Sequence, residues 1–81
     1  MPTIHREEGF RFVIYVDDHE PAHVHVRYAG AIARIRIGDA DHRPIATDPG
    51  SMRTPDVRRA VRIVEANQKQ FFEAWREIHG A

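Results

Sequence analysis

The 81-residue chain contains no cysteine, which excludes disulfides and thiolate metal sites and fits a reducing compartment. It also lacks an uninterrupted apolar run of about 18 residues, the length that a membrane-spanning helix requires. Residues 1–8 do not contain the apolar core of a signal peptide. Together these absences predict a cytoplasmic protein without a membrane span.

An excess of charge of either sign is also missing, because 12 basic residues balance 12 acidic ones. A chain without net charge has no general electrostatic attraction for nucleic acid. Eleven of the basic residues are nevertheless arginine, whose planar guanidinium suits phosphate and carboxylate partners. Four arginines of the C-terminal half support a weaker hypothesis, a nucleic-acid-binding regulator: Arg53, Arg58, Arg59 and Arg62.

The first half of the chain carries the pattern of short strands. Apolar, aromatic and β-branched residues predict strands over residues 10–16, 23–28 and 32–37. Residues 29–31 leave so short a connection that the second and third strands should form a tight antiparallel hairpin. A further short edge strand is expected near residues 43–46, within a loop rich in Asp, Gly and Pro.

Residues 50–81 carry the pattern of one long helix. Thr54 suits the N-cap, Pro55 suits the first helical position, and Gly80 suits the end. Between them apolar residues recur at alternating spacings of four and three. The predicted helix of about 24 residues is roughly 36 Å long, whereas the strands are roughly 20 Å long.

The predicted fold is α+β, in a single domain over residues 1–81. A small antiparallel sheet of three to four strands, within residues 1–49, packs against the long C-terminal helix. Because this helix would extend beyond the sheet, its aromatic end would be exposed unless the sheet, the N-terminal arm or another chain covered it. We therefore expect a protein partner or a homodimer at a docking surface made by four residues of the helix: Phe71, Phe72, Trp75 and Ile78.

Residues 17–28 contain three of the six histidines and three carboxylates. Because strand side chains alternate between faces, His23, His25 and Arg27 should project together. Two histidines on one strand face, with a histidine and a carboxylate from the preceding turn, suit a tetrahedral or facial metal site. The hypothesis is a divalent metal such as zinc, and its ligands would be Asp18 or Asp17, His19, His23 and His25.

A second hypothesis for the same strand face is metal-free phosphodiester cleavage. Two histidines would act as acid and base near neutral pH, and arginines would stabilise negative charge on the phosphate. The predicted catalytic set comprises His23, His25, Arg27, Arg34 and Arg36. A structural interpretation also stays open, in which the acidic residue and the histidine of the turn cap it and the strand histidines bond to neighbouring backbone or carboxylates.

Several segments carry a resemblance to a known family. The chain opens with Met-Pro-Thr-Ile at residues 1–4. Residues 18–28 largely reproduce a family marker, an acidic residue and histidine followed by Pro-Pro-His-x-His-Val-x-Tyr-Gly. Residues 59–61 and 73–75 match the closing helix. On these motifs nearly the whole chain resembles the small bacterial domain-of-unknown-function family numbered 4160.

The sequence departs from the family pattern at several positions. Ala29 intrudes before Gly30, and Asn67 stands where a histidine is common. The resemblance implies a genomic habit rather than an established reaction. Such proteins are often encoded beside a small partner that can carry a helix-turn-helix, in toxin and antitoxin-like pairs.

The leading functional hypothesis is therefore a component of a two-gene toxin and antitoxin-like module that acts through protein contact, as a candidate for its toxin half. The alternative is a small nuclease or metal-dependent hydrolase that uses His19, His23 and His25. These two hypotheses place the active surface differently, on the aromatic helix end or on the histidine-bearing strand.

Overall fold

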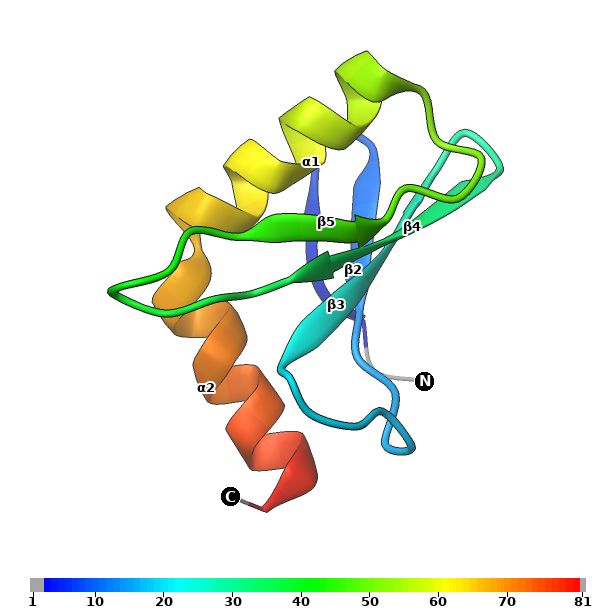
Figure 1. The fold of residues 1–81 in the computed structure, drawn as a ribbon. Coiled ribbons are helices and arrows are strands. Elements are labelled where there is room, and N and C mark those ends of the chain that lie inside the picture. Colours follow the sequence, from blue (N-terminus) through cyan, green and yellow to red (C-terminus); the bar gives the residue numbers. More distant parts are fainter. Residues whose placement is uncertain (1–2, 81) are drawn as a thin grey trace.

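The computed structural model describes residues 3–80, so Met1 and Pro2 of the opening motif, and Ala81, lie outside the described residues. The fold is α+β, as predicted. Five antiparallel strands follow one another in sequence order across a single sheet, and two helices come after them along the same side of the sheet (Figure 1). The elements are β1 (Thr3–Glu7), β2 (Phe10–Val13), β3 (His23–Tyr28), β4 (Ala31–Arg36), β5 (Ile45–Asp48), α1 (Thr54–Ala66) and α2 (Gln68–His79).

The prediction of three to four strands is wrong because it omits the strand at the N-terminus. The segment Thr3–Glu7 lacks the apolar alternation of a half-buried strand, yet it pairs with β2 as an edge strand. Glu8 and Gly9 form the two-residue turn between the two strands, and both adopt positive φ values, 53° and 85°. That conformation matches the twist of a tight hairpin. The expected edge strand near residues 43–46 is β5, shifted to Ile45–Asp48.

The hairpin between β3 and β4 is confirmed. Tyr28 pairs with Ala31, and the two-residue turn between them has φ values of 50° at Ala29 and 82° at Gly30. The left-handed conformation is natural for glycine but strained for alanine. The residue that departs from the family pattern, Ala29, therefore occupies the strained position of this turn.

The single long helix of the prediction is broken at Asn67. This residue has non-helical dihedrals, φ −120° and ψ 21°, and its side-chain amide donates a hydrogen bond to the carbonyl of Ile63 at 2.8 Å. The next residue, Gln68, donates from its side chain to the carbonyls of Ile37 and His42 at 3.0 and 2.9 Å. The two amides fix a bend in which α2 leaves the axis of α1. Arg53, and not Thr54, is the N-cap of α1, and it makes no side-chain capping bond.

The core lies between the helices and one face of the sheet. It contains large side chains that are fully buried, among them Phe10, Phe12, Ile14, Val24, Val26, Ile35, Ile37, Val64, Phe71 and Trp75. Because α2 bends back over the end of the sheet, Phe71 and Trp75 are only 0% and 2% exposed within this one chain. Of the four expected docking residues, Phe72 is 37% exposed and Ile78 is half-buried. A docking surface at this helix end would therefore consist of these last two residues.

Among the described residues, neither helix combines the length and the apolar character that a membrane crossing requires.

Candidate metal centre

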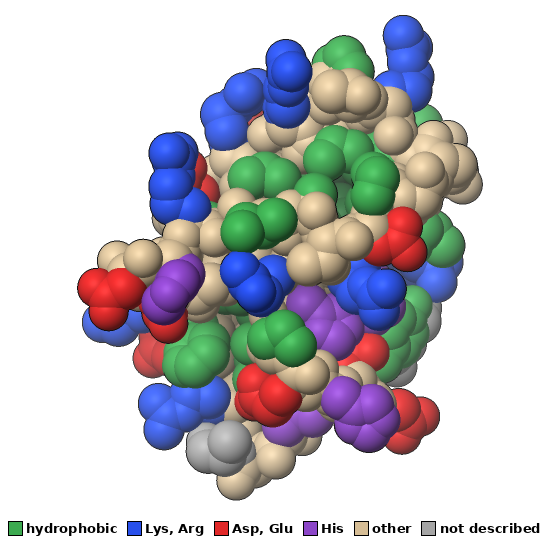
Figure 2. Space-filling view, in the orientation of Figure 1, with side chains coloured by type: hydrophobic (Ala, Val, Ile, Leu, Met, Phe, Trp, Pro, Cys, Tyr) green, Lys and Arg blue, Asp and Glu red, His purple; other side chains and the backbone are tan. Residues whose placement is uncertain are grey.

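The face of the sheet that points away from the core carries His23 and His25 together with the strand arginines. In the register between β3 and β4, His23 lies opposite Arg36 and His25 lies opposite Arg34. Directly paired residues of antiparallel strands share a face, so the predicted catalytic side chains do lie on one face together with Arg27. In the middle of the view in Figure 2, below the strand labelled β5 in Figure 1, histidine, Lys or Arg, and Asp or Glu side chains lie side by side.

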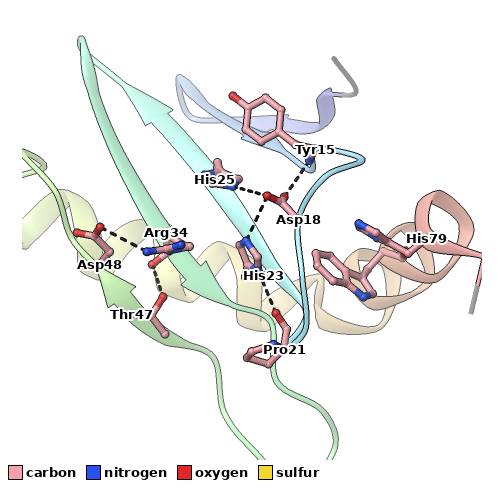
Figure 3. A network of polar contacts seen from close by, with 10 residues as sticks. Tyr15, Asp18, Pro21, His23, His25, Arg34, Thr47, Asp48 and His79 are labelled. Atoms are coloured by element: carbon pink, nitrogen blue, oxygen red, sulfur yellow. Dashed lines mark hydrogen bonds and ion pairs between the residues drawn. The ribbon is translucent and has the colours of Figure 1, made fainter.

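Asp18 is held in position by the turn that follows β2. Its backbone N–H donates to the carbonyl of Tyr15 at 3.1 Å, and its carboxylate Oδ2 accepts the backbone N–H of Tyr15 at 2.9 Å. The backbone bond closes a β-turn over residues 15–18, and the acidic side chain completes the local backbone hydrogen bonding. The second carboxylate oxygen, Oδ1, is thereby aimed at the start of β3, as Figure 3 shows.

Two imidazoles converge on that oxygen. The Nε2 atom of His25 lies 3.1 Å from Oδ1 of Asp18, and the Nε2 atom of His23 lies 3.5 Å from it. One ligand atom from each of the three residues lies within 4.8 Å of the other two. Within residues 3–80 no other group of three or more histidine and acidic side chains brings its ligand atoms so close. The side chains of Asp18, His23 and His25 are 12%, 11% and 21% exposed.

The surroundings of Asp18 favour its ionised form. Burial by itself would raise the pKa of the carboxyl. The hydrogen bonds from Tyr15 and His25, together with the electrostatic effect of the two neighbouring imidazoles, outweigh burial and lower the pKa of Asp18 below its ordinary value. The site therefore presents a carboxylate anion to both histidines.

The hydrogen bonding of His23 defines which of its ring nitrogens carries a proton. Nδ1 lies 2.9 Å from the carbonyl oxygen of Pro21, which can only accept a hydrogen bond, so Nδ1 must be the donor. In the neutral ring the lone pair is then on Nε2, which faces Asp18. Metal-ligating histidines have this arrangement, with one nitrogen donating to a backbone carbonyl and the other free for the metal. The Trp75 ring, 5.3 Å from the ring of His23, packs against the imidazole.

Tyr15 is a site residue that the sequence pattern does not predict. Besides binding Asp18 through its backbone, it lies edge-on to the ring of His25 at 4.7 Å, and its hydroxyl accepts a hydrogen bond from Nη2 of Arg27 at 3.0 Å. The sequence offers no specific signal for this role, because Tyr15 stands within the apolar run of the strand predicted over residues 10–16. Tyr15 thus links the carboxylate, one histidine and one arginine.

The other predicted ligands lie beside this group rather than within it. Asp17 and His19 are exposed and are not part of the group of three converging side chains. They line a neighbouring pocket of about 390 Å³. The same pocket is bordered by Asp18, Glu20, Pro21, His23, Arg34, Arg36 and Thr47. Arg34 also forms an ion pair with Asp48 at 3.6 Å.

The four arginines of the nucleic-acid hypothesis differ in their surroundings. Arg59 packs its guanidinium over the rings of Phe10 and Tyr28, at 5.0 and 5.3 Å, and binds Asp56 at 3.1 Å. The remaining three members of the set, Arg53, Arg58 and Arg62, are exposed. The guanidinium of Arg59 is therefore already engaged within the chain.

The geometry suits a transition metal better than a hard cation. Two neutral imidazoles and one carboxylate are ligands that zinc and related divalent metals prefer. Three protein ligands also leave at least one coordination position for water or substrate, which distinguishes catalytic from structural zinc sites.

Comparison with known proteins identifies a family. The model of a family described as "Domain of unknown function (DUF4160)" matches residues 9–76, which is most of the chain. No curated protein and no solved structure matches it.

Proposed function

Because the chain belongs to the DUF4160 family, whose description defines no activity, we propose a function from the site itself: a metal-dependent hydrolase whose metal ligands are Asp18, His23 and His25. The observation that carries the proposal is the convergence of three ligand atoms within 4.8 Å, two of them imidazole nitrogens directed at one carboxylate oxygen. This choice places the active surface on the strand face and not on the aromatic helix end.

The hydrogen bond of His23 argues for a cation between the ligands. With Nδ1 donating to Pro21, a neutral His23 directs the lone pair of Nε2 at a carboxylate oxygen only 3.5 Å away. Two acceptors facing each other in a largely buried site repel one another. A proton on Nε2 removes the repulsion, and so does a metal ion that accepts both lone pairs. The site is thus built for competition between a metal and protons, as is usual for histidine ligands.

Hydrolysis is the chemistry that fits the open side of this site. Asp18, His23 and His25 would hold a zinc ion, which would lower the pKa of a water molecule to about 7 and so provide hydroxide at neutral pH. Arg34 and Arg36 line the pocket that Asp18 and His23 also border. Although Asp17 and Glu20 also line this pocket, the two guanidiniums can donate to an anionic substrate, and a phosphate ester fits because its negative charge increases on the attacked group.

The family resemblance also implies a two-gene toxin and antitoxin-like module, a proposal that rests on the resemblance alone. A hydrolase would suit the toxin half of such a pair. Contact with the partner at the helix end would use Phe72 and Ile78, because Phe71 and Trp75 are buried in this chain.

Calorimetric titration of zinc, manganese and nickel into chelator-stripped protein tests the metal site. We expect one equivalent of metal to bind the wild type, with at least tenfold weaker binding in Asp18→Asn and His25→Ala. His42→Ala is the matched control, since His42 is exposed, bonded to Asp39 and not part of the converging group. His19→Ala, which removes an exposed histidine outside the group, should also retain wild-type affinity.

Circular dichroism must show that each variant is folded before its affinity is compared. An absence of binding by the wild type, or equal affinity in His25→Ala, would refute the metal site. Cleavage of bis(p-nitrophenyl) phosphate tests the hydrolase. We expect cleavage that requires added metal and is lost in His25→Ala, and metal binding without any such cleavage would argue against a phosphodiester substrate.

A further inference from the structure

A second cluster of cations lies on the same sheet face, at the other end of the strands from the metal ligands. Arg6, Arg11 and Arg27 occupy directly paired positions on three neighbouring strands, since Arg6 pairs with Arg11 and Arg11 pairs with Arg27. Side chains in such positions point to one face and are close enough to interact. We call these three residues the arginine row.

The arginine row has no anion of its own. Within residues 3–80, none of the three guanidiniums forms an ion pair with a carboxylate, although other arginines of the chain do so. The hydroxyl of Tyr15, which accepts from Arg27, is an uncharged partner. Like charges placed directly opposite one another destabilise a sheet. The row thus concentrates positive charge that the chain leaves unbalanced.

Two nitrogens of the row also lack hydrogen-bond partners. The Nε atoms of Arg11 and Arg27 are buried and make no hydrogen bond. Such unpaired donors are rare in folded proteins because they lose water without gaining an acceptor. Each guanidinium can turn about its side-chain torsions, so an anion that entered between them would supply the acceptors that the protein does not provide.

A hollow beside the row offers room for that anion. A pocket of about 410 Å³ is lined by all three arginines and by the two tight turns of the neighbouring hairpins. No acidic side chain lines it; its other residues are Gly9, Tyr28, Ala29, Gly30, Ala31 and Ile32. Charge, unpaired donors and space therefore coincide at one place.

We propose that the arginine row binds a phosphate group. Three guanidiniums present more donors than the two oxygens of a carboxylate can accept, whereas a tetrahedral phosphate offers several oxygens to several forks at once. The site is separate from the metal ligands and stands independently of the proposed hydrolase. Tyr15 joins the two sites, because it contacts His25 with its ring and Arg27 with its hydroxyl.

The test is calorimetric binding of inorganic pyrophosphate to metal-free protein at low salt. We expect binding by the wild type that becomes at least tenfold weaker in Arg11→Gln and in Arg27→Gln. Arg58→Gln removes the same charge from an exposed position on α1 and should bind like the wild type. Since Arg11→Gln removes a repelling charge from the row, its melting temperature should equal or exceed that of the wild type. Unfolding could not then explain a loss of pyrophosphate binding in Arg11→Gln.

Two further ligands, a single-stranded RNA and succinate, test which kind of anion the site binds. A short single-stranded RNA that competes with pyrophosphate would assign the site to a phosphodiester backbone, and a failure to compete would assign it to a small phosphate. Equal affinity for succinate would overturn the phosphate assignment. So would wild-type binding by Arg11→Gln, or an equal loss in Arg58→Gln, which would indicate diffuse charge attraction.

The same variants separate this inference from the proposed function. Arg11→Gln should bind zinc like the wild type, and His25→Ala should bind pyrophosphate like the wild type. A wild type that bound pyrophosphate but not zinc would contradict the metal site and leave the arginine row intact, whereas a wild type that bound zinc but not pyrophosphate would do the opposite.

Discussion

Trp75 tests whether the aromatic end of α2 packs within this chain or against a partner. The indole is 2% exposed, its ring lies 3.9 Å from that of His79, and its Nε1–H donates to Oε1 of Glu20 at 3.2 Å. These contacts make it a core side chain of this chain rather than a docking residue for another. Replacement of Trp75 by alanine should therefore lower the melting temperature of the protein, and it should not dissociate a complex.

The size of the effect follows from burial. Truncating a buried tryptophan to alanine costs about 3–5 kcal/mol, whereas a chain of this length has a free energy of unfolding of roughly 4–12 kcal/mol. In a domain of this size each kcal/mol shifts the melting temperature by about 4–8 °C. We therefore expect Trp75→Ala to lower the melting temperature by about 12–40 °C.

Thermal unfolding followed by circular dichroism measures this loss, and size-exclusion chromatography of each variant reports any change of assembly. Phe72→Ala is the matched control, because Phe72 lies on the same helix but is 37% exposed. Its truncation should cost less than about 1 kcal/mol, or less than about 8 °C. If Trp75→Ala kept a melting temperature within a few degrees of the wild type while its elution shifted, the core assignment would be refuted.

The central strands could be predicted because local pattern and tertiary environment agree there. In β3 the alternation of His23, Val24 and His25 predicts that the valine enters the hydrophobic core and that the two histidines lie on the opposite face. The strand β1 could not be found in this way, since an edge strand of polar residues has no apolar period. Its only local sign is the turn at Glu8 and Gly9, and a glutamate is not a residue that typically marks a left-handed position.

The bend between the helices lies outside what periodicity can show. The apolar stripe continues on both sides of Asn67, so the pattern favours one uninterrupted helix. The bend depends on the Asn67 amide, which binds the carbonyl of Ile63, and on Gln68, which reaches Ile37 and His42 in a loop far away in sequence. These are tertiary contacts, and they decide that the aromatic end folds back onto the sheet.

The candidate site, like the fold, can be predicted only in part from the sequence. The common face of His23 and His25 follows from strand alternation, and the sequence predicts it. The choice of Asp18 over Asp17, and the exclusion of His19 from the converging group, depend on the turn that Tyr15 closes. A turn's side-chain directions are set by its dihedrals, which the residue types alone leave open.

Two further predictions concern the turns that hold the strands. Ala29→Gly should raise the unfolding free energy by about 0.5–1 kcal/mol, because it relieves a left-handed alanine at φ 50°. Its control is Ala31→Gly within β4, which should lower stability, and equal losses in both variants would contradict the argument. Asp18 predicts a pH dependence of the metal-free protein. Since folding lowers the pKa of Asp18, its ionised form contributes stability in full above the unfolded-state pKa of about 3.9. That stability is lost as the pH falls through the lower folded-state pKa. Denaturant unfolding at a series of pH values should therefore show the wild type losing stability more steeply than Asp18→Asn below about pH 4. Parallel profiles in that range would mean that the bonds from Tyr15 and His25 do not stabilise the carboxylate.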